Sequence, residues 1–114
     1  MAQLIVDDTH VHVLLHPFEK LGALHRDFSV PRSAVTLARA TDRPFAEIRG
    51  LRVPGTGVPR VVALGTWRGR HRRDFVAVRR GDAEAVVLEL DEADFSRLIV
   101  GVDDAGPVLE ALRR

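Results

Sequence analysis

The sequence lacks cysteine, and it contains only one methionine, one tryptophan and one lysine among its 114 residues. Without cysteine the chain forms no disulfide, no zinc–thiolate site and no thiol nucleophile. This absence agrees with a reducing compartment. The N-terminus has no basic region ahead of its first apolar residues, so it does not resemble a secretory signal. We therefore expect a cytoplasmic protein.

Long apolar runs and an excess of one charge are also missing. The longest runs, such as residues 61–64 and 98–102, are far shorter than the about 20 residues that a membrane-spanning helix requires. The formal net charge is only +1, whereas domains that bind duplex nucleic acid are usually strongly basic. We therefore expect no nucleic-acid partner. The charges are uneven, with six arginines in residues 68–80 and six carboxylates in residues 82–94.

The apolar residues follow the pattern of a β-rich domain. Residues 9–16 alternate, with Val11, Val13 and Leu15 on one face and three histidines on the other, which predicts a half-buried strand. Residues 18–24 fit either two helical turns or an irregular loop. Further short strands are predicted at residues 27–30, 34–40, 61–67, 75–79, 84–90 and 97–102.

Turn-forming residues separate these strands. Residues 50–59 contain two prolines and three glycines, which predict a long loop. Gly81 and Asp82 predict a tight hairpin that places Arg79 opposite Glu84, a stabilising cross-strand pair.

The last segment changes to a helical period. Asp103 or Asp104 can cap a helix whose first turn tolerates Pro107. The apolar stripe of this helix consists of Val108, Leu109 and Leu112. Six or seven antiparallel strands followed by one helix favour a barrel or split barrel capped by that helix, because closure removes exposed strand edges. We expect a single domain over residues 1–114, with its core at about residues 9–112.

In this order, the motifs resemble those of the bacterial pleckstrin-homology-like (PH-like) domain proteins, in particular small actinobacterial members. The matching motifs are Thr9-His-Val-His-Val, Phe18-Glu-Lys-Leu, Val30-Pro, Gly50-Leu-Arg, Pro54-Gly-Thr, Leu64-Gly, Asp74-Phe-Val-Ala-Val-Arg, the run 86–90, and Leu98-Ile-Val with Asp103. The resemblance implies a seven-stranded barrel with a C-terminal helix, and often an oligomer. It implies no enzyme and carries over no catalytic residue. Arg60 stands where a glycine is common in that family.

The arginine-rich tip between two predicted strands is the first candidate site. Guanidinium groups bind phosphate through paired hydrogen bonds, so the tip is a candidate contact for phosphate, an anionic lipid surface or a protein partner. Its residues, with the neighbouring loop arginine, are Arg60, Arg68, Arg70, Arg72 and Arg73. The alternative is a solvated turn whose charge is balanced by the acidic strand predicted beside it.

The histidines are the second candidate. His10 and His12 lie two residues apart on one strand face, a spacing that can chelate a divalent metal, and Asp8 could approach from the strand start. His16 lies too far along the strand to share the ion. Two ligands make a weak site, so we expect no metal or other cofactor, and exposed or interface histidines are the simpler interpretation.

Catalytic motifs are missing from the sequence. No Gly-x-Ser-x-Gly pattern surrounds Ser29, Ser33 or Ser96, and no Gly-Lys-Ser/Thr follows the glycines of the loop. We therefore expect a non-catalytic interaction or assembly module, not an enzyme. It would form homo-oligomers, or bind a protein partner, through a strand edge or the histidine-bearing face. The alternative is weak binding of anionic lipid or phosphate by the arginine tip.

Overall fold

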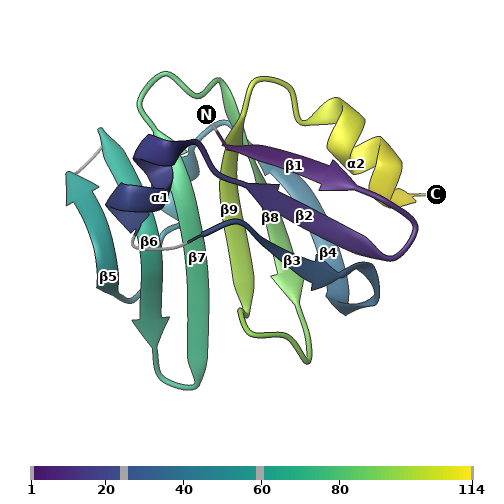
Figure 1. Cartoon of the computed structure of the whole chain (residues 1–114), viewed down its shortest axis with the longest axis horizontal. Helices are drawn as coiled ribbons and strands as arrows, with labels where there is room; N and C mark the ends of the chain where they lie inside the picture. Colours follow the sequence, from purple (N-terminus) through teal and green to yellow (C-terminus); the bar gives the residue numbers. More distant parts are fainter. Residues whose placement is uncertain (1, 24–25, 59–60, 114) are drawn as a thin grey trace.

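The computed structural model describes residues 2–23, 26–58 and 61–113 and is mostly β. Nine strands in this part of the chain form two sheets (Figure 1). The small sheet, in the order β1-β2-β3, contains β1 (Gln3–Val6), β2 (His10–Leu14) and β3 (Phe28–Pro31). The large sheet, in the order β4-β8-β9-β7-β6-β5, contains β4 (Val35–Thr41), β5 (Leu51–Val58), β6 (Val62–Gly69), β7 (Arg72–Arg79), β8 (Glu84–Leu90) and β9 (Arg97–Val102). The helical elements are α1 (Pro17–Ala23), α2 (Gly106–Arg113) and the 3-10 turns η1 (Arg32–Ala34) and η2 (Pro44–Glu47).

The main core lies between the two sheets. From β2 it receives Val11 and Val13, which are fully buried, because alternate residues of a strand point to opposite faces. From β7 it receives Phe75, whose ring lies 4.9 Å from that of Phe28 and 5.6 Å from that of Phe95, between centroids. The alternation predicted for residues 9–16 therefore places the correct side chains inside.

A second core covers the opposite face of the large sheet. Val76 and Ile99 are fully buried there, and Phe45 and Ile48 pack against this cluster. Phe45 and Ile48 belong to residues 42–50, which we call the crossover segment. This segment connects β4, at one edge of the large sheet, to β5 at the other edge. The large sheet is thus buried on both faces, which explains the near-continuous apolar runs of its central strands.

Ion pairs fix the crossover segment against the large sheet. The Arg39 guanidinium donates two hydrogen bonds to the Glu47 carboxylate, at 2.9 and 2.7 Å. Arg49 donates to both oxygens of the buried Asp74 carboxylate, at 2.7 and 3.2 Å. The hydrogen bonds from Arg39 hold the pKa of Glu47 below its ordinary value. The Glu47 pair therefore stabilises the fold fully above the ordinary carboxyl pKa, and this contribution is lost as the pH falls through the lowered value.

Both helices begin at caps that the sequence provides. At α1, the backbone N–H of His16 donates to the carboxylate of the buried Glu19 at 2.9 Å. Residues 17–23 are helical, so the first of the two interpretations for residues 18–24 is confirmed there. At α2, the Asp104 carboxylate accepts a hydrogen bond from the Gly106 N–H at 2.9 Å. The apolar stripe of α2 packs on the main core, beside β1 and β4 (Figure 1).

The β-rich class and the C-terminal helix are confirmed, but the closed barrel is not. Over the described residues the two sheets stay separate, with nine strands rather than six or seven. The pair β7–β9 is parallel, so the expectation of purely antiparallel strands is wrong. None of the helices in this part of the chain has the length and apolar character that crossing a membrane demands.

The hairpin predicted at Gly81 and Asp82 is wrong. β9 is inserted between β7 and β8 and pairs with both of them, so Arg79 does not lie opposite Glu84. The Arg79 guanidinium lies instead 3.8 Å from the Glu19 carboxylate. Asp82 accepts a hydrogen bond from the Arg79 N–H at 2.7 Å, and burial raises the pKa of its carboxyl group. The acidic strand β8 is therefore not the neighbour of the arginine-rich strand β7.

The loop predicted for residues 50–59 is largely a strand. Residues 51–58 form β5, which lies at an edge of the large sheet. An edge strand tolerates Pro54, because an N–H that faces away from the sheet is not needed for pairing. The register with β6 shifts between Arg52 and Gly55, around this proline. Pro59 lies outside the described residues.

Candidate functional site

The four sheet edges differ in their protection against strand addition. β1 and β3 have only four residues each, and β3 ends at Pro31. β5 carries Pro54 and an irregular register. Short, proline-bearing or irregular edges resist pairing with another strand. β4, in contrast, has seven residues without proline, and its register is regular from Leu37 to Thr41.

The β4 edge also presents no unpaired charge. Its single charged residue, Arg39, is neutralised by the two hydrogen bonds to Glu47. Leu37 is an apolar side chain on this strand that is 54% exposed. Natural monomers usually place lysine, proline or a bulge on such an edge to prevent association. Between Leu37 and Thr41, β4 has none of these devices.

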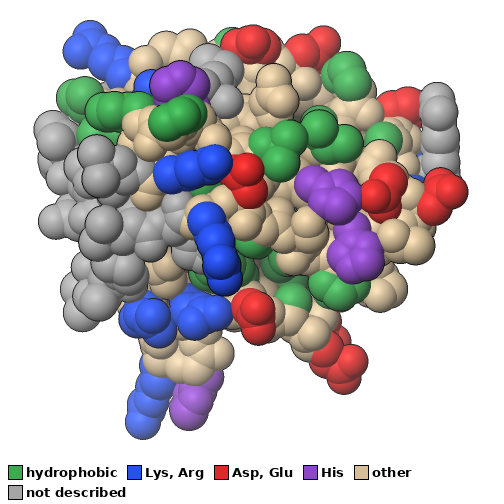
Figure 2. Space-filling view, in the orientation of Figure 1, with side chains coloured by type: hydrophobic (Ala, Val, Ile, Leu, Met, Phe, Trp, Pro, Cys, Tyr) green, Lys and Arg blue, Asp and Glu red, His purple; other side chains and the backbone are tan. Residues whose placement is uncertain are grey.

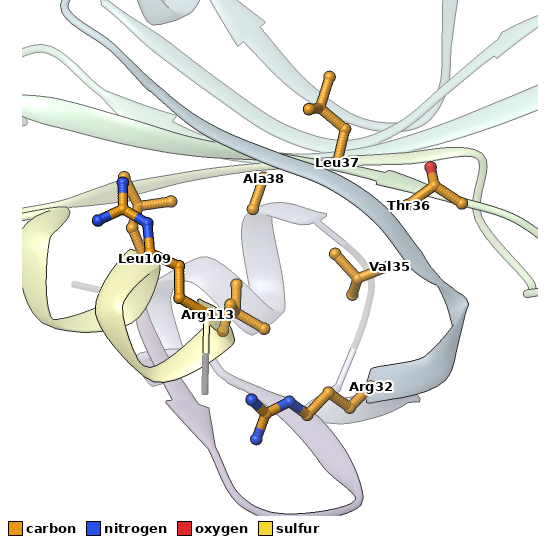
Figure 3. Close-up of a pocket in the computed structure, with 8 residues that line it drawn as sticks. Arg32, Val35, Thr36, Leu37, Ala38, Leu109 and Arg113 are labelled. Carbon is orange, nitrogen blue, oxygen red and sulfur yellow. The ribbon is translucent and has the colours of Figure 1, made fainter.

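A groove lies between β4 and α2 (Figure 3). It is lined by Arg32, Val35, Thr36, Leu37, Ala38, Leu109, Leu112 and Arg113. Ala38 points to the side of β4 that faces α2, whereas Leu37 points to the opposite side (Figure 3). Arg32 donates to the carbonyl oxygen of Ala111 at 2.7 Å and so fastens the end of α2 beside β4.

The arginine tip is the turn between β6 and β7. Gly69 pairs with Arg72, so the turn itself consists of Arg70 and His71. His71 adopts a φ of 60°, in the left-handed region that few non-glycine residues occupy. Figure 2 shows basic side chains and a histidine gathered at the lower end of this hairpin. The structure brings together four of the predicted site residues, Arg68, Arg70, Arg72 and Arg73, whereas Arg60 lies outside the described residues.

The arginines of the tip differ in their surroundings. The Arg73 Nε donates to the Asp94 carbonyl oxygen at 3.0 Å, and its guanidinium lies 4.8 Å from the centre of the Phe95 ring. Arg72 lies along the turn, with a buried Nε that has no hydrogen-bond partner among the described residues. Arg68 lies directly opposite Arg73. Like charges in this arrangement destabilise a sheet.

The histidine face of β2 carries a hydrogen-bonded chain of three residues. His12 Nδ1 lies 2.6 Å from Ser29 Oγ, and His12 Nε2 lies 2.6 Å from Asp7 Oδ2. Ser29, on β3, is the residue directly opposite His12. The contact with His12 holds the pKa of Asp7 well below its ordinary range. The carboxylate that approaches the histidines is therefore Asp7, where Asp8 was expected. Figure 2 shows histidine and acidic side chains side by side on this sheet.

His10 and His12 are the two candidate metal ligands, and both lie on β2. Their ring centroids lie 6.1 Å apart, and His10 Nδ1 lies 2.9 Å from Thr9 Oγ1. His16 follows β2 and accepts a hydrogen bond from the Phe18 N–H at 3.2 Å, so it serves α1 instead. In the described ranges, no group of three or more histidine, aspartate or glutamate side chains is arranged to hold a metal. The pair stays a weak two-ligand prediction.

Sequence reasoning missed two of these features. The β4 edge depends on long-range pairing, which fixes the strand order, although the lack of proline and lysine in residues 35–41 is visible in the sequence. The hydrogen-bonded series of Asp7, His12 and Ser29 side chains depends on the register between β2 and β3. A local signal was available only at Asp7, because an aspartate two residues before Thr9 is typical of a side-chain-capped turn.

Comparisons of the chain with protein-family models, curated proteins and solved structures find no match. The resemblance to bacterial PH-like proteins therefore stays a prediction from sequence motifs. The surfaces described above are the basis for assigning a role to the protein.

Proposed function

We propose that the protein is a non-catalytic assembly module that associates with a second copy of itself through the edge of β4. The observation that carries this proposal is the difference between the four sheet edges. β1, β3 and β5 are short, proline-bearing or irregular. β4 has seven residues without proline and no unpaired charge, its register shifts only between Val35 and Leu37 and is regular from there to Thr41, and Leu37 is exposed. A free edge of this kind offers backbone N–H and C=O groups to another strand.

A second copy suits this edge because β4 is compatible with itself. Two antiparallel copies of β4 related by a twofold axis would join the two large sheets into one. In a pairing centred on Ala38, Arg39 of one copy lies opposite Leu37 of the other, so the two arginines do not face each other. Because each Arg39 is already paired with Glu47, association requires no new ion pair.

The sequence resemblance agrees with this role. Bacterial PH-like domain proteins often form oligomers and share no catalytic residues, so membership would favour assembly over catalysis. The closed PH-like barrel belongs to the same prediction. A protein partner that supplies its own free strand would use the same edge. Sedimentation velocity of the purified protein distinguishes it from a second copy, because no other partner is present in that sample.

We expect the substitution Leu37→Lys to weaken self-association by at least tenfold. A lysine on an edge strand opposes strand addition, and because Leu37 is exposed the change should alter folding stability by only about 0.5 kcal/mol. Sedimentation velocity of the purified protein over a range of concentrations measures the effect. The matched control is Ile5→Lys, which places the same charge at a 47% exposed residue of another edge strand, β1.

Three outcomes would contradict the proposal. The wild type could be a monomer at high micromolar concentration, in which case β4 does not pair with a second copy. Leu37→Lys could associate as well as the wild type, or Ile5→Lys could be the weaker of the two. An oligomer that persists in Leu37→Lys but is weaker at pH 5 than at pH 8 would place the contact on the histidine face of β2.

A second candidate function is weak binding of phosphate groups by the arginine tip. The observation that favours it is the gathering of Arg68, Arg70, Arg72 and Arg73 at the end of one hairpin, where their guanidinium groups can bind phosphate oxygens. In addition, Arg70, Arg72 and Arg73 form no ion pair with any described carboxylate. Each cation near an anionic lipid surface contributes about 1 kcal/mol, so the binding would be weak and sensitive to salt.

For this candidate, we expect the double charge reversal Arg68→Glu with Arg70→Glu to reduce sedimentation with acidic liposomes by about tenfold or more at low salt. The matched control is Arg43→Glu with Arg80→Glu, which reverses two exposed arginines away from the tip. Neutral liposomes and added inorganic phosphate separate a lipid surface from free phosphate. Equal binding by both double variants would remove the tip as a site.

A further inference from the structure

Three side chains on the open face of the small sheet form a continuous hydrogen-bonded chain. Ser29 Oγ lies 2.6 Å from His12 Nδ1, and His12 Nε2 lies 2.6 Å from Asp7 Oδ2. The residues come from three places: β3, β2 and the turn that joins β1 to β2. Because His12 and Ser29 are directly opposite each other in the antiparallel pair, the sheet itself fixes their distance.

The direction of the hydrogen bonds follows from the state of Asp7. Its other oxygen, Oδ1, accepts hydrogen bonds from the backbone N–H groups of Thr9 and His10, at 2.8 and 2.7 Å. These contacts and the one to His12 favour the ionised carboxylate, which can only accept. Nε2 of His12 must therefore carry the proton. In neutral imidazole Nδ1 is then the acceptor, so the Ser29 hydroxyl donates its proton to it.

We propose that Ser29 is a nucleophile activated by His12 and Asp7, and that it accepts acyl groups from small activated esters. A serine that donates to a histidine oriented by a carboxylate has the groups, in the order, that acyl transfer to serine uses. In the usual triad Nε2 faces the serine and Nδ1 faces the carboxylate, whereas here Nδ1 faces Ser29 and Nε2 faces Asp7. The proton still moves from the serine hydroxyl to the imidazole.

The step balances without a further reactant. Ser29 Oγ attacks the carbonyl carbon of the ester, and its proton moves to His12 Nδ1. The bond from the carbonyl carbon to the leaving oxygen then breaks, and that oxygen takes the proton from His12 Nδ1. Asp7 stays ionised throughout and stabilises the transient imidazolium through Nε2. The product is an acyl ester on Ser29.

The exposure of the three side chains gives a small ester donor direct access. Ser29 is exposed, and the side chains of His12 and Asp7 are 35% and 49% exposed, so a donor reaches the hydroxyl without any movement of the chain. The same exposure admits water and supplies no dry cavity around the reacting carbonyl. We therefore expect selective acylation of Ser29 rather than rapid turnover. This inference is independent of the role proposed for β4.

The test is acetylation by p-nitrophenyl acetate, located by mass spectrometry of peptides from the intact folded protein. Ser33 provides an internal reference, because it is an exposed serine four residues away. We expect the rate at Ser29 to exceed the rate at Ser33 by at least tenfold in the wild type. His12→Gln should reduce the acetylation rate of Ser29 to that of Ser33. Asp7→Asn should lower the acetylation rate of Ser29 by a smaller factor. Circular dichroism shows whether each variant remains folded.

Ser29→Ala is the site control, and Ser33→Ala should leave the labelling of Ser29 unchanged. The proposal is overturned if Ser29 and Ser33 react at the same rate in the wild type. It is also overturned if folded His12→Gln labels Ser29 as fast as the wild type does, because Ser29 would then be an ordinary surface hydroxyl held in a hydrogen bond.

Discussion

Replacing Asp74 by asparagine is expected to lower the free energy of unfolding by about 3 kcal/mol, because one partner of a buried ion pair is removed. The Asp74 side chain is 1% exposed and accepts two hydrogen bonds from Arg49. An asparagine amide cannot accept both, so the guanidinium of Arg49, in the crossover segment, loses one of its two hydrogen bonds. Urea denaturation, followed through the single tryptophan, Trp67, measures the change.

The matched control is Glu110→Gln, which breaks the ion pair with Arg113 on the surface of α2. The side chains of Glu110 and Arg113 are 59% and 74% exposed, so this change should cost less than about 1 kcal/mol. If Asp74→Asn were no more destabilising than Glu110→Gln, the Arg49–Asp74 pair would not be what holds the crossover segment to the sheet. The crossover segment would then be held by the Arg39–Glu47 pair and by the packing of Phe45 and Ile48.

Replacing Phe75 by alanine is expected to lower the free energy of unfolding by about 3–5 kcal/mol, the range for a large aromatic side chain removed from a core. Phe75 is fully buried between the two sheets, and its ring contacts those of Phe28 and Phe95. The loss combines the apolar surface of one ring with the cavity left between two others. Denaturation with guanidinium chloride gives the value.

Phe18→Ala serves as the control, because the Phe18 side chain is 55% exposed and its ring lies against the Arg79 guanidinium rather than in the main core. This substitution should lower the free energy of unfolding by no more than about 1 kcal/mol. A second check uses Trp67, which lies in the other core. If the two cores unfold together, Trp67 fluorescence and circular dichroism of Phe75→Ala give the same midpoint. A Phe75→Ala loss below 1 kcal/mol would contradict the assignment of the main core.

Features set by local sequence could be predicted. The alternation around Val11 and Val13 gave the buried face of β2, and the caps and stripe of α2 gave the C-terminal helix. Features set by long-range pairing could not. Nothing local indicates that β9 lies between β7 and β8, because the order of strands depends on pairing between residues that are far apart in the sequence. For the same reason Pro54 suggested a loop, although an edge strand accepts it.

The candidate sites follow the same division. The arginine tip was predicted in the correct place because turn residues and charges are local. The prediction that an acidic strand lies beside it was wrong, because β9 separates β8 from β7. The β4 edge and the pairing of His12 with Ser29 both depend on register and strand order, so they became visible only in the fold.

The most direct test of the proposed role is amide hydrogen exchange of the wild-type protein at low and at high concentration. Alternate N–H groups of an edge strand face outward, and they become protected when another strand pairs with them. Pairing of two copies predicts slower exchange at high concentration for alternate residues of β4, with no change in β1, β3 or β5. Unchanged exchange in β4, or protection confined to another edge, would contradict the account.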